Sequence, residues 1–179
     1  MKIKHIPRAC FSLIGFFIVT LQSAQPADSG SFAQLRMATS RVPGWTEQKE
    51  QYRFFTANDL YGIIDGAAAE HQKQGLKSGI GLSLTGGTKS LEIYFEDFGT
   101  PSRAKSMVNT KKTSLSSPGI IPQVKVSPAI YEEVLGGCIA FWAKGHYYVE
   151  MTLTGYDSTK IAVRDAAVLI DSLSPSIVK

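Results

Sequence analysis

Residues 137–173 read GCIAFWAKGHYYVEMTLTGYDSTKIAVRDAAVLIDSL, and they predict a β-hairpin followed by a helix. Two runs rich in apolar and aromatic residues flank Lys144-Gly145, which is typical of two strands joined by a tight turn. Asp157 or Ser158 then provides an N-cap for the helix. Apolar residues at helical spacing give this helix a single buried stripe: Ala162, Ala166, Leu169, Ile170 and Leu173.

The two faces of this hairpin differ in polarity. With Lys144-Gly145 as a two-residue turn, Phe141 lies opposite Tyr148 and Ala143 opposite His146. The other face is almost wholly apolar, so we predict that it covers the core. That face carries Cys138, Ala140, Trp142, Tyr147, Val149 and Met151.

A second hairpin is predicted upstream, over residues 80–95. Its strands alternate with period two around the turn Thr85-Gly86-Gly87-Thr88. Thr100 and Pro101 then begin a helix, as N-cap and first helical residue. Residues 124–126 are a candidate short strand between this helix and the final hairpin.

The amino-terminal part of the domain predicts one strand and one helix. Residues 50–55 have the character of a strand, and Thr56 is placed to cap a helix that ends at Gly75. The predicted order is therefore β-α-β-β-α-β-β-β-α. We predict a single α+β domain over residues 42–179, with an antiparallel sheet and helices packed mainly on one face.

The non-core faces of the two hairpins carry aromatic and acidic side chains. If the hairpins are neighbours in the sheet, these side chains form one surface with the composition of a binding site. Tyr and Glu are also common on ordinary half-exposed strands, where cross-strand pairs stabilise the sheet, so a structural role stays open. The predicted binding residues are Glu92, Tyr94, Glu96, Phe141, His146, Tyr148 and Glu150.

The helix predicted after Thr56 contains a second candidate site. Asp65 and Gly66 precede three alanines, which allows either close packing tied by a carboxylate or a ligand-binding carboxylate. Glu70 and His71 are adjacent, so they point ~100° apart on a helix and cannot easily chelate one ion. A zinc site would need a distant His such as that of residue 146. We therefore assign no catalytic residue, metal ligand or cofactor.

Two short motifs carry a resemblance to a known family. They are Pro43-Gly44-Trp45 and the run LYGIIDGAA at residues 60–68. With them the chain resembles an uncharacterised family of exported bacterial proteins, a domain of unknown function for which no activity is established. More distantly, the order of strands and helices is similar to that of PsbP-like domains, which act as accessory subunits.

The first 24 residues predict a secretory signal peptide. Lys2, Lys4 and Arg8 precede the 13-residue apolar stretch Ala9–Leu21. A membrane span needs roughly 20 apolar residues, so this stretch fits a signal that is cleaved near Ala24, with an uncleaved anchor as the alternative. Residues 25–41, rich in Ser, Ala and Gln, are predicted to be a linker. No later segment is apolar enough to span a membrane.

Charge and cysteine content limit the classes of partner and chemistry. Without the three basic residues of the signal, 16 basic residues face 15 acidic ones, so a nucleic-acid partner is not indicated. Cys138 is then the single cysteine, which excludes an internal disulfide. Its predicted position in an apolar core favours an unreactive thiol.

These observations predict an exported, non-catalytic binding or accessory module of the cell envelope. Its partner would be an envelope protein or a small molecule. Two alternatives remain open at this point. The first is a hydrolase-like enzyme with a carboxylate and histidine site near the first helix, and the second is a metal or cofactor carrier.

Overall fold

The computed structural model describes residues 30–63 and 68–177. Its α-helices are α1 (Gly30–Ser40), α2 (Ala68–Lys73), α3 (Pro101–Ser114) and α4 (Thr159–Leu173). Its strands are β1 (Thr46–Glu47), β2 (Arg53–Thr56), β3 (Ser78–Gly86), β4 (Lys89–Asp97), β5 (Gly119–Ile120), β6 (Ala129–Val134), β7 (Gly137–Lys144) and β8 (Tyr147–Thr154). Short 3₁₀ turns lie at Lys49–Gln51, Leu60–Gly62 and Ser174–Ser176.

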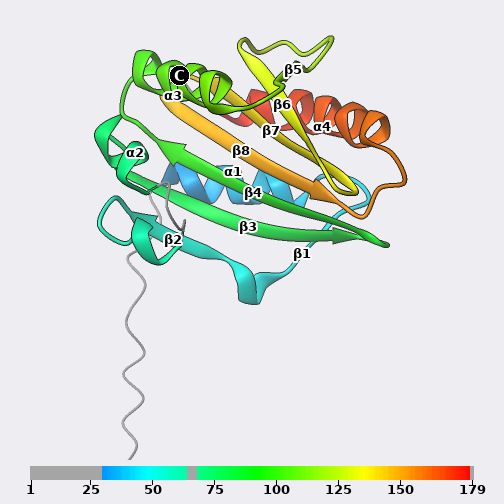
Figure 1. Ribbon diagram of the computed structural model, residues 1–179. Helices are drawn as coiled ribbons and strands as arrows, with labels where there is room; N and C mark the ends of the chain where they lie inside the picture. Colours follow the sequence, from blue (N-terminus) through cyan, green and yellow to red (C-terminus); the bar gives the residue numbers. More distant parts are fainter. Residues whose placement is uncertain (1–29, 64–67, 178–179) are drawn as a thin grey trace, which may run out of the picture.

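All the strands pair antiparallel in one sheet. The order is β1-β3-β4-β8-β7-β6-β5, and β2 also pairs with β3 (Figure 1). The predicted α+β class is therefore confirmed. Because β4 pairs with β8, the two predicted hairpins are neighbours at the centre of the sheet.

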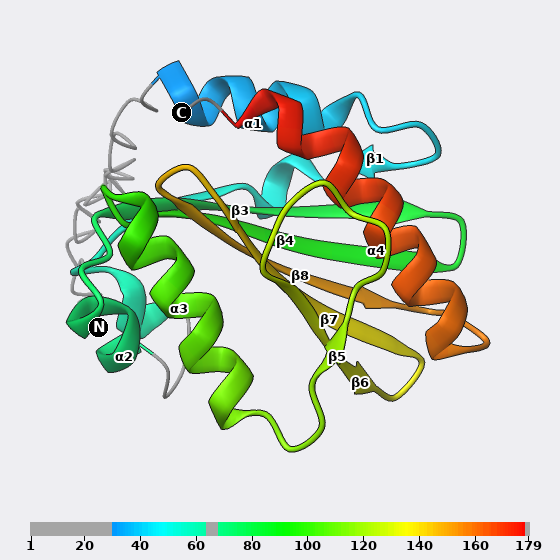
Figure 2. The same ribbon diagram turned by 90° about the horizontal axis from the view of Figure 1, so that it is seen from above.

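Helices cover both faces of the sheet, where we had expected them mainly on one. Helices α1 and α4 lie on one face, and α2 and α3 lie on the other (Figure 2). The reason is visible in the central strands, where Phe141 and Trp142 are neighbours in sequence and both are buried. Strands that are apolar on both faces need a cover on each side.

The hairpin β7–β8 keeps its predicted faces but turns one residue later than expected. Lys144 pairs with Tyr147, so the turn residues are Gly145 and His146. Gly145 has φ +57°, and the first turn position is where a type II′ turn places glycine. The register shifts by two residues, so Phe141 lies opposite Glu150 instead of Tyr148. A register shift of two residues leaves every strand side chain on its predicted face. The prediction for the core-facing residues is confirmed, since the core cluster contains Cys138, Ala140, Trp142, Tyr147, Val149 and Met151.

Part of the predicted linker is a helix. Residues 30–40 form α1, in which Phe32 and Leu35 are buried. The ring of Phe32 packs edge-on against Tyr147 of β8, with ring centroids 5.7 Å apart. The expectation of a linker over residues 25–41 is thus wrong for this stretch, because two inward-facing apolar side chains are enough to dock a short helix.

The helix predicted from Thr56 to Gly75 does not begin at Thr56, which is the last residue of β2. The Asp59 carboxylate accepts hydrogen bonds from the backbone N–H and the hydroxyl of Thr56, at 2.9 and 2.7 Å, and so closes a turn after β2 instead of opening a helix. A single 3₁₀ turn, Leu60–Gly62, follows, and the described residues of α2 are 68–73. Asp65 and Gly66 lie outside the described residues.

Between residues 100 and 126 one prediction is confirmed, the start of α3, and one is wrong, the short strand. Thr100 caps α3 by accepting a hydrogen bond from the Arg103 N–H, and Pro101 is its first residue. The strand expected at residues 124–126 is absent from this part of the structure, and β5 and β6 lie on either side of it. None of the helices in the described residues has the length and apolar character that crossing a membrane requires.

Candidate functional site

A buried histidine–glutamate pair lies between α2 and the sheet. The Nδ1 atom of His71 is 2.6 Å from the Oε2 atom of Glu96, and both side chains are 0% exposed. Helix α2 carries His71, and Glu96 stands on β4 directly opposite Tyr148 of β8. The rings of Phe98 and Tyr148 flank the imidazole, with centroids 6.3 and 5.9 Å away. The pair is therefore held in an aromatic environment that excludes water.

Each member of the pair has one polar atom without a hydrogen-bond partner among the described residues. These atoms are Nε2 of His71 and Oε1 of Glu96. Burial raises the pKa of the Glu96 carboxyl, and the hydrogen bond from His71 offsets only part of that effect. A buried polar atom without a partner costs free energy, so this pair is poised to take up a further hydrogen bond.

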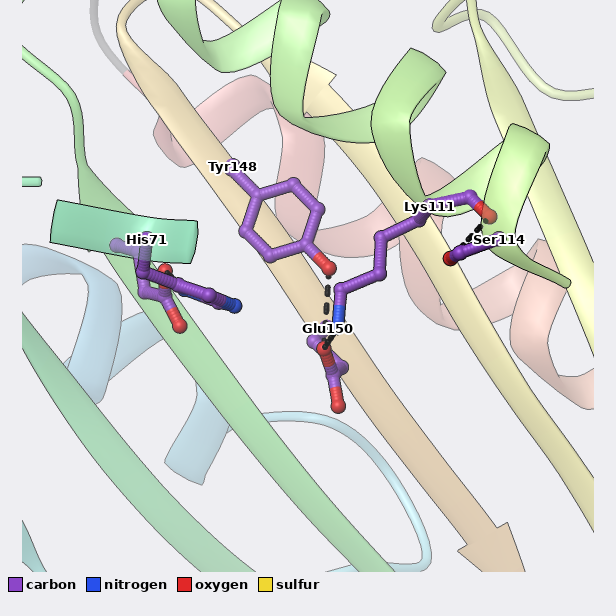
Figure 3. Close-up of polar contacts among 6 residues, drawn as sticks. His71, Lys111, Ser114, Tyr148 and Glu150 are labelled. Carbon is purple, nitrogen blue, oxygen red and sulfur yellow. Dashed lines mark hydrogen bonds and ion pairs between the residues drawn. The ribbon is translucent and has the colours of Figure 1, made fainter. Parts of the chain in front are cut away.

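A second polar group lies beside the pair, nearer the surface. The Tyr148 hydroxyl donates a hydrogen bond of 3.0 Å to Oε2 of Glu150, and Nζ of Lys111 on α3 is 3.7 Å from the same oxygen (Figure 3). Burial raises the pKa of Tyr148 well above its ordinary value, and the Glu150 charge acts in the same direction. The hydroxyl therefore stays protonated and serves as a donor.

The predicted binding residues share one face of the sheet, but half of that face is covered. Register places Tyr94 and Phe141 on either side of Glu150, so these three residues are contiguous, a point that the sequence left open. The exposure of this face is where the expectation is wrong. Helices α2 and α3 bury Glu96, Phe141 and Tyr148, leaving Tyr94 and Glu150 half-buried.

Two of the predicted residues lie apart from this covered cluster. Glu92 is exposed and lines a polar hollow of about 340 Å³, whose other walls include Ser83, Thr85 and Thr152. His146 belongs to the β7–β8 turn, where its Nε2 atom is 3.8 Å from Asp97 Oδ1 and its ring stacks on Tyr147.

The histidines do not form a metal site in the part of the chain that is described. No group of three or more His, Cys, Asp or Glu side chains that could hold a metal ion occurs in residues 30–63 and 68–177. Glu70, the neighbour of His71, is only half-buried, and its charge acts on Tyr148 beside the pair.

Sequence reasoning missed a groove on the opposite face of the molecule. It has a volume of about 650 Å³ and lies between α4 and the β5–β6 segment. Three large apolar side chains at its walls are exposed, namely Ile120 (72%), Ile161 (38%) and Val168 (59%). Ile161 and Val168 are two helical turns apart and lie outside the buried stripe of α4. This second apolar stripe is the sequence feature that could have indicated the groove.

The charges around this groove are unevenly placed. Lys160 and Arg164 lie one turn apart on the amino-terminal half of α4, and Glu133 stands on the β6 wall. Asp171 lies at the other end, where its Oδ1 atom accepts a 3.1 Å hydrogen bond from the backbone N–H of Lys125. The groove therefore has a cationic pair at one end and a carboxylate already engaged by the backbone at the other.

Comparison with known proteins gives one distant likeness. No family model and no curated relative matches the sequence. The extracellular domain of PknH from Mycobacterium tuberculosis is similar in structure, with a TM-score of 0.47 and 14% sequence identity over 86% of this chain and 94% of that one. The resemblances to an exported family and to PsbP-like domains remain predictions.

Proposed function

We propose that the chain is an exported, non-catalytic binding module and that the groove along α4 is its contact surface. The observation that carries this proposal is the gathering of three exposed large apolar side chains, Ile120, Ile161 and Val168, in one hollow of about 650 Å³. Ligand sites are concave, mostly apolar and fringed by a few polar groups. An exposed apolar concavity of this kind is costly unless something covers it.

The proposal moves the binding surface away from the sheet face that the sequence suggested. Phe141 and Tyr148 are 3% and 0% exposed, so a partner could reach them only after α2 or α3 moved. The groove needs no such movement. Export rests on the signal predicted for residues 1–24, and α1 is the first element among the described residues.

Binding of an uncharged apolar dye tests the groove directly. N-phenyl-1-naphthylamine becomes fluorescent in apolar surroundings, and we expect the purified protein to bind it. Val168→Asp should abolish binding, because it places a charge on the groove wall. Leu135→Asp is the matched control, since Leu135 is fully exposed outside the groove and its variant should bind as the natural protein does. Equal binding by all three proteins would contradict the proposal.

A hydrolase-like site at α2 is the second candidate function. One observation favours it: His71 is oriented by a carboxylate through Nδ1 while its Nε2 has no partner among the described residues, as in a general base. Against it, both side chains are fully buried. Hydrolysis of p-nitrophenyl acetate separates the two functions. Loss of activity in folded His71→Gln, with His146→Gln unaffected, would favour the enzyme over the binding module.

A further inference from the structure

We infer that the α4 groove takes a long-chain carboxylate, with the apolar chain along Val168 and Ile120 and the anionic head at Lys160 and Arg164. This inference rests on the proposed function and adds the class of ligand. It depends on three features of the groove: its apolar floor, its length and the position of its charges.

The floor of the groove suits an unbranched apolar chain. Ile120 and Pro122 form one wall, and Val163, Ala167 and Val168 form the other. The distance from Lys160 to Asp171 is 11 residues of helix, or ~16 Å at 1.5 Å per residue. An apolar groove of this length that is open to solvent fits a single extended chain.

The charges at the amino-terminal end of α4 favour an anion. Lys160 lies in the first turn of a 15-residue helix whose first turn holds no acidic residue. The helix dipole makes this end positive, so a cation there is unfavourable. An added anion is stabilised by the dipole and by the Lys160 charge. Arg164 is 73% exposed in its side chain, and its contact with Asp165 is long, at 3.4 Å. Glu133 on the β6 wall and Asp165 beside Arg164 offset part of this positive charge, and the helix dipole adds to what is left.

The opposite end of the groove sets the orientation. Asp171 would repel a carboxylate, and its own hydrogen bond to the Lys125 N–H holds it in place. A neutral or cationic head group would not be drawn to Lys160 and Arg164. The arrangement therefore selects both the sign of the head group and the direction of the chain.

Competition against bound N-phenyl-1-naphthylamine tests the inference. The competitors are dodecanoate, dodecan-1-ol and dodecyltrimethylammonium, each kept below the concentration at which it forms micelles. We expect dodecanoate to displace the dye best. The double variant K160E/R164E should weaken dodecanoate about tenfold relative to dodecan-1-ol, which corresponds to ~1.4 kcal/mol, after both are corrected for the dye affinity measured for the same variant. Lys105→Glu, an exposed position on α3, is the matched charge control.

The outcomes separate this inference from the proposed function. If dodecan-1-ol competes as well as dodecanoate, or if K160E/R164E has no effect, the inference is overturned while dye binding that Val168→Asp abolishes still supports a binding groove. If the dye does not bind at all, both fail. If light scattering shows a dimer that Val168→Asp dissociates, a second copy of the chain occupies the groove, and the carboxylate ligand is overturned.

Discussion

The two faces of the sheet differ in kind, although the same strands form both. The face under α1 and α4 is closed by apolar side chains such as Trp142 and Val149. The face under α2 and α3 is also buried, but it contains the His71–Glu96 pair and the Tyr148–Glu150–Lys111 group. Apolar burial gives stability in proportion to area, whereas a buried ion pair contributes little net stability and fixes particular atoms in place. The comparison suggests that the first face provides stability and the second provides geometry.

The largest effect should come from the apolar face. Trp142 is 0% exposed, and Trp142→Ala should lower the free energy of unfolding by about 3–5 kcal/mol through lost burial and a cavity. Urea denaturation followed by circular dichroism measures this loss. Trp142→Phe should lose clearly less, because the indole N–H has no partner among the described residues and its removal leaves nothing unsatisfied. Equal losses in the two variants would contradict the account.

The next effect is expected at the buried pair. Glu96→Leu leaves His71 buried without its partner and should cost about 3 kcal/mol. Adding His71→Leu should return most of that stability, because an apolar pair of similar volume avoids desolvation of both groups. The same urea titrations give the comparison. A double variant that is less stable than the single one would show that the pair itself stabilises the fold.

A smaller effect is expected at the tyrosine beside the pair. Tyr148→Phe keeps the ring contacts with His71 and Phe98 and removes only the 3.0 Å hydrogen bond to Glu150. It should cost about 1.5–3 kcal/mol, the range for a hydrogen bond to a charged group, and the low end is expected because Glu150 is half-buried. The thermal melting temperature measures the change. Tyr131→Phe is the control and should be nearly neutral, because this half-buried tyrosine of β6 makes no side-chain hydrogen bond to any residue in 30–63 or 68–177.

The smallest effect is expected at Cys138, whose burial raises its pKa to about 12. The native protein should not react with 5,5′-dithiobis(2-nitrobenzoate) at pH 8, whereas the urea-unfolded chain should react at once. The folded state holds the thiol proton more tightly than the unfolded state does, so this group lowers stability as pH rises from about 9 towards 12. Rapid labelling of the native protein would show that the apolar face is open.

Local patterns explain which elements could be predicted. Both hairpins have strand-forming runs around a glycine turn, α3 carries a cap and α4 an apolar stripe, so these elements follow from neighbouring residues. Helix α1 has only Phe32 and Leu35 to anchor it within a stretch of small and polar residues, and its docking depends on β8 and β2. The unbroken apolar run at residues 138–143 was a usable sign that both faces of the sheet are covered.

The candidate sites depend on contacts that no local pattern contains. His71 and Glu96 are 25 residues apart and meet because α2 packs on the sheet face that carries Glu96. The groove is formed by α4 and by the β5–β6 segment, which lie about 40 residues apart in the chain. Sequence alone identified the chemical types on the sheet face, and the apolar run indicated a cover there without identifying α2 and α3 as the elements that provide it.

The groove also has an evolutionary consequence. Ile120, Ile161 and Val168 are exposed and lie outside both buried clusters, so replacing them leaves the packing of the core unchanged. Surface substitutions of this kind usually change stability by less than about 0.5 kcal/mol. Homologous chains could therefore exchange one ligand for another by drift at three positions, with selection on the ligand acting almost independently of selection on folding.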